Sequence, residues 1–337
     1  MDKPSAAARL TAGLGSLAAM LLAVAALAAQ PQKGWTITSL GALPSQRHFS
    51  TAEAINNAGD VVGWSTVFDP AANADRAYAI LWRDGEMLNL GEGSALSINQ
   101  HGTVAGSVVG GLSLWKDGQW THLGMGGAPN GINKFEDIAG WEMGGQNHAY
   151  LYKDGVLFDL GTLGGATSTA EAINDRGQVA GWAQVASGGN DHAFLFEDGV
   201  MKDLGTLEGG FVSRAHDVNN RGVVVGEAWQ ANGNSIPFIY DGTMRRMFQT
   251  TDCCVVPRAI NDHGAVVGTT NGNASFVYDD GVVTRLESIP AVQAGGWTQL
   301  IPNDINDRGW IVGMGRKGPL VSPAQQEWFA FVLKPPA

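Results

Sequence analysis

The sequence has little positive charge, and this shortage excludes a class of partner. Lys and Arg total 21 against 32 Asp and Glu, which gives the 337-residue chain a formal net charge of −11. The basic residues form no cluster, whereas duplex nucleic acids and anionic membrane surfaces are bound by clustered positive charge. The sequence therefore predicts no nucleic-acid partner.

The sequence also lacks the common motifs of catalytic and cofactor sites. It contains no G-x-x-x-x-G-K-S/T phosphate loop, no H-E-x-x-H zinc motif, no EF-hand loop and no G-x-S-x-G nucleophile elbow. No cofactor or metal is indicated. The acidic segment 69–75 is a place where calcium could bind, but the spacing of its carboxylates does not require it.

Long apolar runs are absent beyond the amino terminus. Lys3 and Arg9 precede an Ala/Leu-rich stretch, 10–27, and Ala26-Leu27-Ala28 has the small residues that a signal peptidase recognises. We expect residues 1–29 to be a signal peptide and the rest of the chain to be secreted or periplasmic. An uncleaved anchor stays open, because this stretch is long enough to cross a bilayer. No other membrane contact is predicted, and no cysteine follows the site to carry a lipid.

Glycine is abundant, with 47 residues, and it belongs to a repeat. A ten-residue element occurs in seven copies. Its positions, in order, hold a mostly small residue, Ile or Val, Asn, two variable residues, Gly, a variable residue, two apolar residues and Gly. Successive repeat asparagines are 43, 34, 41, 45, 42 and 45 residues apart, the length of four short strands in one propeller blade. The repeat asparagines are Asn56, Asn99, Asn133, Asn174, Asn219, Asn261 and Asn306.

Each repeat predicts two hairpins. Asn followed three residues later by Gly suits a tight turn between strands, although the third copy has Glu136 in place of Gly. An aromatic strand follows, and in six copies it ends in Asp-Gly, a strong hairpin signal. The seventh aromatic strand, 328–333, has no partner after it, whereas the extended segment 35–40 has none before it.

These counts predict an all-β fold over residues 35–334. We expect a seven-bladed β-propeller of four-stranded antiparallel blades, closed where 35–40 pairs with 328–333. Closure removes the exposed sheet edges that an open array would leave. An open solenoid is the structural alternative.

The repeats resemble those of the HAF family, which is named for a His-Ala-Phe motif. The triplet is His192-Ala193-Phe194, with Asp-Leu-Gly-Thr-Leu at 203–207 and AINDRGQVAGW from Ala172. The resemblance covers essentially all of residues 35–334. It implies an extracellular bacterial repeat protein and no established activity, so it supplies no catalytic residues.

Ligand-binding candidates occupy one position of the repeat. The residue three places before each repeat asparagine falls on the innermost strand, where we expect it near the mouth of the central channel. Among these residues, Glu171, His216 and Arg258 are the candidates for acid–base catalysis. The alternative is a ring of hydrated polar groups. The seven residues are Glu53, Leu96, Asn130, Glu171, His216, Arg258 and Asn303.

The two faces of such a fold would differ. The Asn and Asp-Gly turns, of nearly constant length, share one face, and loops of varied length share the other. We name the second face the variable face and expect it to hold the ligand site, because rigid scaffolds commonly carry function on varied loops. Its long loops are 65–76, 247–257, 287–302 and 314–327, against 107–111 as a short one.

Cys253 and Cys254 are the only cysteines, and they fall in one of the long loops. In an exported chain, an adjacent pair favours a vicinal disulfide. Two small packed residues, or a metal pair, stay open as alternatives. His148 with Asp159 and His192 with Asp203 recur with the repeat, and we expect hydrogen bonds within a blade.

The sequence favours a secreted binding or interaction module over an enzyme. Such a module would recognise a glycan, a small molecule or a protein through the variable face. The alternatives are a propeller lyase or hydrolase with acid–base residues at the channel mouth, and a structural repeat protein of the cell surface. The ligand itself is not identified by the sequence.

Overall fold

The computed structural model describes residues 34–45, 48–108, 111–124, 127–142, 147–186, 189–270, 274–318 and 327–336. The expected signal peptide, residues 1–29, lies outside the described residues. Within the described ranges, no helix is long and apolar enough to span a membrane. The regular structure of these ranges is β-strand, apart from the short helices η1 (Leu286–Ser288) and α2 (Pro290–Ala294).

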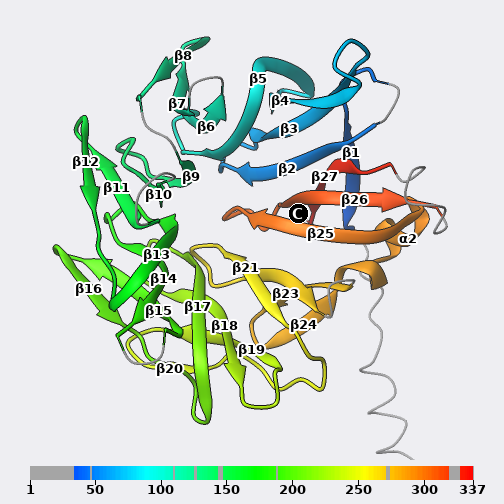
Figure 1. Cartoon of the computed structure of the whole chain (residues 1–337). Coiled ribbons are helices and arrows are strands. Elements are labelled where there is room, and N and C mark those ends of the chain that lie inside the picture. Colours follow the sequence, from blue (N-terminus) through cyan, green and yellow to red (C-terminus); the bar gives the residue numbers. More distant parts are fainter. Residues whose placement is uncertain are drawn as a thin grey trace, which may run out of the picture.

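Five of the sheets have four antiparallel strands each, arranged around a common centre (Figure 1). Their strands are β9 (Ala128–Ile132), β10 (Ile138–Trp141), β11 (Ala149–Lys153) and β12 (Val156–Asp159); β13 (Gly164–Ile173), β14 (Val179–Val185), β15 (Asp191–Glu197) and β16 (Val200–Asp203); β17 (Gly210–Val218), β18 (Val224–Gln230), β19 (Ser235–Tyr240) and β20 (Met244–Arg246); β21 (Val256–Ile260), β22 (Val266–Thr270), β23 (Ala274–Asp279) and β24 (Val282–Arg285); and β25 (Trp297–Ile305), β26 (Ile311–Lys317), β27 (Phe329–Lys334) and β1 (Thr36–Gly41).

A further sheet has seven strands and contains two repeats. Its long strand β5 pairs with β4 from Glu86 to Glu92 and with β6 from Gly93 to Ile98. The outermost strand of one four-stranded unit therefore continues directly into the innermost strand of the next. The strands are β2 (Ser50–Ile55), β3 (Val61–Asp69), β4 (Ala74–Arg83), β5 (Glu86–Ile98), β6 (Val104–Val108), β7 (Gly111–Lys116) and β8 (Gln119–His122).

The chain closes through its first and last described strands. β1 pairs antiparallel with β27, and Thr36 lies opposite Lys334 while Ser39 lies opposite Phe331. The predicted pairing of 35–40 with 328–333 is confirmed. The all-β propeller architecture is confirmed with it, because every sheet is antiparallel and the last sheet takes its outer strand from the chain's beginning.

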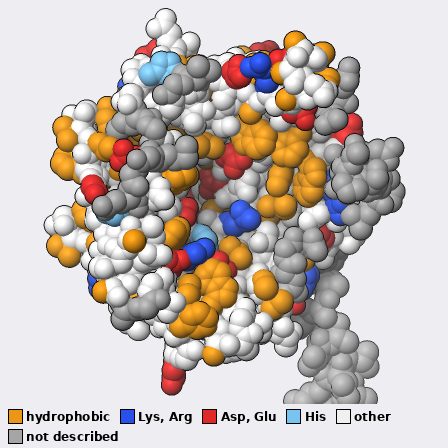
Figure 2. Space-filling model, in the orientation of Figure 1, with side chains coloured by type: hydrophobic (Ala, Val, Ile, Leu, Met, Phe, Trp, Pro, Cys, Tyr) orange, Lys and Arg blue, Asp and Glu red, His pale blue; other side chains and the backbone are white. Residues whose placement is uncertain are grey.

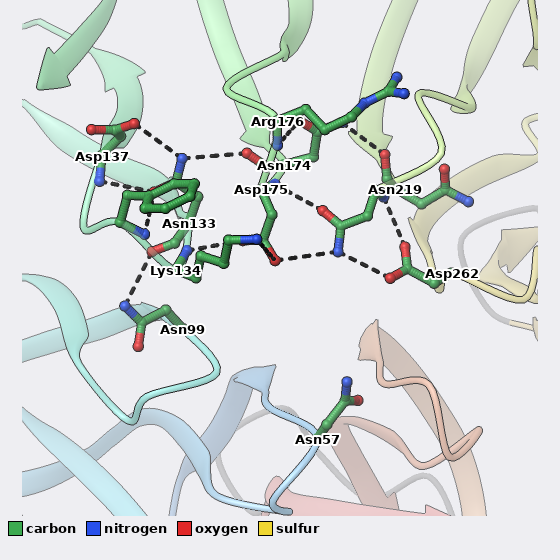
Figure 3. A network of polar contacts seen from close by, with 12 residues as sticks. Asn57, Asn99, Asn133, Lys134, Asp137, Asn174, Asp175, Arg176, Asn219 and Asp262 are labelled. Atoms are coloured by element: carbon green, nitrogen blue, oxygen red, sulfur yellow. Dashed lines mark hydrogen bonds and ion pairs between the residues drawn. The ribbon is translucent and has the colours of Figure 1, made fainter.

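The repeat asparagines form a belt around the channel (Figure 3). Each is buried, and its Oδ1 accepts hydrogen bonds from backbone N–H groups of its own turn, as Asn174 does from Arg176 and Gln178 at 3.0 Å. Each Nδ2 donates to the backbone carbonyl of the repeat asparagine in the following unit, at 2.8–3.3 Å. The seventh, Asn306, donates to Asn56, so the belt is continuous.

The core lies between neighbouring sheets. A large side chain on the third strand of several units is fully buried at the same position of the repeat, which explains the recurring aromatic residue. These residues are Phe194, Phe238, Phe276 and Phe331. Burying an aromatic side chain of this size is a main source of stability in a small core.

The Asp-Gly turns have the expected geometry in five cases of six. Asp198 and Gly199 have φ of 51° and 79°, the left-handed values of a two-residue type I′ turn. The exception is Asp241-Gly242, where Tyr240 pairs with Met244 and the loop contains three residues. There Asp241 instead forms an ion pair with Arg245.

Two of the expected long loops are shorter in the structure. Within 65–76, β3 and β4 pair as far as Asp69 opposite Ala74, so a long hairpin replaces most of the loop. Within 287–302, η1 and α2 are followed by β25, which begins at Trp297. Both corrections have one cause: strand pairing or a short helix satisfies backbone groups that an open loop would leave to water.

Candidate functional site

The innermost strand of every unit carries a β-bulge. In β13, Ala170 pairs with Gly181 and Ala172 with Ala180, so Glu171 has no partner in the ladder. A bulge turns a side chain away from the sheet's normal alternation. The same register shift leaves one residue unpaired in each innermost strand, and together we call these the bulge ring: Glu53, Leu96, Asn130, Glu171, His216, Arg258 and Asn303.

The bulge explains the last glycine of the repeat. A Cβ atom on Gly181 would lie 2.0 Å from the carbonyl oxygen of Thr169, a distance that no side chain tolerates. The equivalent separation in the other units is 1.9–2.5 Å. This glycine is therefore required by close approach of the bulged strand, and its equivalents are Gly63, Gly106, Gly140, Gly226, Gly268 and Gly313.

All seven residues of the bulge ring line one cavity of about 490 Å³. They precede the repeat asparagines on strands that start at the variable face, so the cavity occupies that half of the channel. Figure 2 shows acidic, basic and histidine side chains gathered in the central hollow of the molecule. The structure brings together the residues predicted as a ring, whereas ligand binding by them stays a prediction.

The variable loops contribute little to this cavity. Of the expected loop 247–257, only Val256 lines it, and it lies on β21. None of the described residues of 65–76, 287–302 or 314–327 is among the lining residues. The walls come from the innermost strands, which are more rigid than loops and position side chains more precisely.

Glu171 is held in place by its neighbours. Trp182 donates its indole N–H to Oε1 at 3.0 Å, and Asn130 of the preceding unit approaches Oε2 at 3.5 Å. Asn130 also donates to the carbonyl oxygen of Ala170 at 2.8 Å. The carboxylate thus has a fixed orientation at the channel wall.

Glu53 has the same arrangement three units away. Trp64 donates to its Oε1 at 3.0 Å, and Asn303 lies 3.4 Å from its Oε2 and 2.9 Å from the carbonyl oxygen of Ala52. Burial raises the pKa of Glu53 above its usual value, and hydrogen bonds and the charge of Arg258 only partly oppose this. Two Asn–Glu pairs, each with a tryptophan, therefore face the cavity.

His216 and Arg258 supply the basic groups. The Nε2 atom of His216 is buried, lies 3.5 Å from Oε1 of Glu227 and has no hydrogen-bond partner among the described residues. Within the same described set, no atom accepts a hydrogen bond from Arg258, whose pKa is lowered by burial despite the nearby charges of Glu53 and Glu227. The guanidinium therefore has unused donors that face the cavity.

Sequence reasoning missed two carboxylates of the channel. Asp217 and Asp304 occupy the first position of the repeat element, where the other copies have Ala, Ser or Gly. Each accepts a hydrogen bond from its own strand and one from the next unit, from Ile260 at 2.7 Å and from Ile55 at 2.8 Å. The signal that would have found them is an acid where the repeat favours a small residue.

These two carboxyl groups are costly to ionise. Burial between the strands raises the pKa of Asp217 to about 7, and the nearby Asp304 and Asp262 raise it further. Burial likewise raises the pKa of Asp304 to about 6, with a contribution from Asp307. Both residues line the cavity of the bulge ring and also the smaller cavity at the asparagine turns.

The opposite end of the channel is a smaller cavity of about 180 Å³, at the asparagine turns. The residue after each repeat asparagine faces it, and most of these side chains accept the N–H of the preceding unit, as Asp175 does from Lys134 at 2.9 Å (Figure 3). Asn220 and Asp262 continue this second ring. These groups are engaged with one another, which favours a structural role.

The paired histidines and acids lie outside the cavity. His148 bonds Asp159 at 2.9 Å, and His192 bonds Asp203 at 3.0 Å, each through Nδ1. Both pairs join the third and fourth strands of one unit. The expected hydrogen bonds within a blade are confirmed.

Cys253 and Cys254 lie in the loop between β20 and β21 and are not joined by a disulfide in this structure. Cys254 is exposed, with φ of 57°, and neither residue lines the cavity. A vicinal disulfide stays a prediction. Across the described ranges, no group of three or more His, Cys, Asp or Glu is arranged to hold a metal ion.

Comparison with known proteins identifies the fold and no more. Neither a protein-family model nor a curated protein sequence matches the chain. A puromycin-hydrolyzing peptidase of Mycobacterium tuberculosis has a similar structure, with TM-score 0.53 and 14% identity over 85% of this chain and 53% of its own.

Two other solved structures are similar as well. YCF48 bound to D1 peptide matches with TM-score 0.51 and 12% identity over 90% of this chain and 97% of its own. TolB from Acinetobacter baumannii matches with TM-score 0.47 and 16% identity over 66% of this chain and 62% of its own. At these identities the likeness shows a shared fold, and function has to be argued from the cavity.

Proposed function

We propose that the protein is an exported binding module that takes a small polar molecule in the cavity of the bulge ring. One observation carries the proposal: seven bulges at the same repeat position turn seven side chains into one cavity. The cavity volume of about 490 Å³ lies in the range of small-molecule sites. Export rests on the amino-terminal signal and on the resemblance to HAF repeats.

The polar groups of the ring support binding over a purely structural role. The second ring, at the asparagine turns, uses its side chains to join neighbouring units. By contrast, Arg258 is exposed to the channel, lines the cavity and donates a hydrogen bond to no described atom. The Nε2 atom of His216 makes no hydrogen bond to a described atom and lies 3.5 Å from Oε1 of Glu227, within ion-pair distance. Donors that no side chain of the protein engages are available to a bound molecule.

The test is a thermal-shift screen of residues 30–337 against glycans, amino acids, nucleotides and divalent cations. A ligand of the folded state raises the midpoint, since a hundredfold excess over Kd adds about 2.7 kcal/mol of stability. The Arg258→Gln variant should abolish the shift. Its matched control is Arg245→Gln, which removes an exposed arginine that pairs with Asp241 outside the cavity.

Each outcome of the screen has a consequence. A shift that survives Arg258→Gln but is lost when the loop 247–255 is shortened would place recognition on the variable loops and contradict the cavity. No shift with any compound would favour a macromolecular partner or a structural role at the cell surface. Both results would overturn the proposal.

Acid–base catalysis is the second candidate function, because burial raises the pKa of one carboxyl group of the bulge ring. The raised pKa of Glu53 suits a proton donor, and the imidazole of His216, which makes no hydrogen bond through Nε2 and lies 3.5 Å from Oε1 of Glu227, suits an acceptor. A lyase or hydrolase would show turnover with a bell-shaped pH dependence, lost in His216→Gln and Glu53→Gln. Saturable binding without turnover assigns the cavity to a binding module.

A further inference from the structure

The charges of the cavity are separated around the bulge ring. Glu53 lies on β2 and Glu171 on β13, whereas His216 and Arg258 lie on the adjacent inner strands β17 and β21. The apolar Leu96 is on β5. A ligand in the cavity therefore meets fixed carboxylates in two directions and a basic pair in a third.

Acidic groups are in excess on the cavity wall. Glu53 and Glu171 line it, against the single permanent cation of Arg258, and Asp217 and Asp304 line it as well. The raised pKa values of Asp217 and Asp304 reduce the negative charge that these two add near neutral pH. A surface of this kind favours a ligand that carries positive charge. A neutral sugar would gain nothing from the excess, and a simple anion would be repelled by it.

Arg258 adds the opposite requirement. Its five N–H groups find no acceptor among the described residues, although arginine is the side chain best suited to bind a carboxylate through two parallel hydrogen bonds. A ligand oxyanion would satisfy these donors. A simple diamine would leave them unsatisfied and place its own charge near the guanidinium.

A buried hydroxyl on the same wall is also unengaged. Ser97 is only 7% exposed, its Oγ has no hydrogen-bond partner among the described residues, and it lines the cavity next to Leu96 in the sequence. It occupies the repeat position of Asp217 and Asp304, which use their oxygens to bridge units. Buried hydroxyl groups are normally hydrogen-bonded, so Ser97 is an exception, but its Oγ has almost no accessible surface and would reach a bound molecule only if the wall shifted.

We propose that the bulge ring binds a small zwitterion, of the amino-acid type, whose carboxylate pairs with Arg258 and whose ammonium group is held by the carboxylates of Glu53 and Glu171. The inference rests on the proposed function and deepens it by naming the ligand class. The Asn and Trp side chains fix the two glutamates before the ligand arrives, which lowers the entropic cost of binding.

The experiment compares three sets of probes that differ only in their end groups, and adds L-α-amino acids as a fourth set. Isothermal titration calorimetry of residues 30–337 is run with ω-amino acids, α,ω-diamines and α,ω-dicarboxylic acids of three to six carbons, and with L-α-amino acids. We expect an amino acid to bind most tightly. Arg258→Gln and Glu171→Gln should each weaken it about tenfold or more, because each removes a charged hydrogen bond.

A control separates binding from folding. Arg245→Gln should bind each probe as tightly as the unchanged protein does. The melting temperatures of Arg258→Gln and Glu171→Gln should be no lower than that of Arg245→Gln. Arg258→Gln should leave diamine binding equal or stronger, because it removes a positive charge. This change of preference is not expected from a residue that merely supports the fold.

The results distinguish the ligand class from the site. Tightest binding by diamines or by dicarboxylic acids, or no binding by any probe, would overturn the zwitterion. If the thermal-shift screen then finds another ligand that depends on Arg258, the cavity remains the binding site. If no ligand depends on any residue of the bulge ring, the proposed function fails as well.

Discussion

Asn306 donates a hydrogen bond from Nδ2 to the backbone carbonyl of Asn56, 3.0 Å away, although 250 residues separate the two. The same bond joins every pair of neighbouring repeat asparagines. The repeat asparagine therefore does two things at once: it closes its own turn, and it links that turn to the next unit. The ring is therefore closed in two ways, by the pairing of β1 with β27 and by the hydrogen bond from Asn306 to Asn56.

Replacing Asn306 with alanine should destabilise the whole protein. The substitution leaves the part-buried N–H groups of Arg308 and Trp310 without their acceptor, at a cost of about 1–3 kcal/mol for each group left unsatisfied. It also removes the bond to the carbonyl of Asn56, which keeps only its bond from Gly59. Urea unfolding measures the loss. Asn232→Ala, in an exposed turn, is the control and should change stability little; equal losses in both variants would contradict a role for the belt.

Gly181→Ala should be among the most damaging single changes. The new Cβ would overlap the carbonyl oxygen of Thr169, so the bulge at Glu171 has to give way. The comparison is Gly199→Ala, which has φ of 79° and nothing near its Cβ, and costs only the strain of a left-handed residue, about 1–2 kcal/mol. We expect circular dichroism melts to show the larger loss for Gly181→Ala, and the reverse order would show that the bulge is not tightly held.

Glu136→Gly should leave stability unchanged or raise it slightly. Glu136 has φ of 68° where the other repeats have glycine, and in return it forms an ion pair with Lys116 at 2.6 Å. This ion pair holds the pKa of Glu136 below its usual value, but surface pairs are screened and contribute little. Glu136→Gln keeps the strain and loses the pair, so chemical denaturation should find it the less stable of the two variants.

The stability of the protein should fall as the pH rises from about 4 to about 7. Asp217 and Asp304 have pKa values near 7 and 6 in the folded protein, above the usual value of 3.8. Between the unfolded-state pKa and the folded-state pKa, each carboxyl group keeps its proton in the folded protein and releases it in the unfolded chain. A rise in pH through the folded-state pKa values therefore removes stability, on the order of a few kcal/mol at most.

The measurement is urea unfolding across this pH range for the unchanged protein and for Asp217→Asn with Asp304→Asn. The double variant should be less stable overall, since an amide cannot accept both backbone bonds, but its pH slope should be smaller. An unchanged slope would mean that these carboxyl groups do not titrate near neutrality.

The sequence predicted the strands and their closure because the signals are local and repeated. Asn-x-x-Gly and Asp-Gly specify turns, and an unpaired strand at each end leaves few ways to pair them. The convergence of Glu53 and Arg258 on one cavity was likewise predictable, because equivalent positions of a closed repeat lie at the same height in the channel.

Other features of the site depend on register and were not predictable. The alternation of residues along β13 does not indicate that Glu171 is skipped in the ladder, and the bulge became evident only from the pairing. The bond from Trp182 to Glu171 follows from that shift. Asp217 and Asp304 were missed because the repeat was treated as a consensus, whereas these two copies depart from it.

The most direct test of the account is a crystal structure of residues 30–337 with the tightest ligand from the binding experiments. The account predicts that the ligand lies in the central cavity, with its oxyanion on Arg258 and its other polar groups toward Glu53 and Glu171. A ligand held instead by the loop that contains Cys253 and Cys254, with the bulge ring unoccupied, would contradict it.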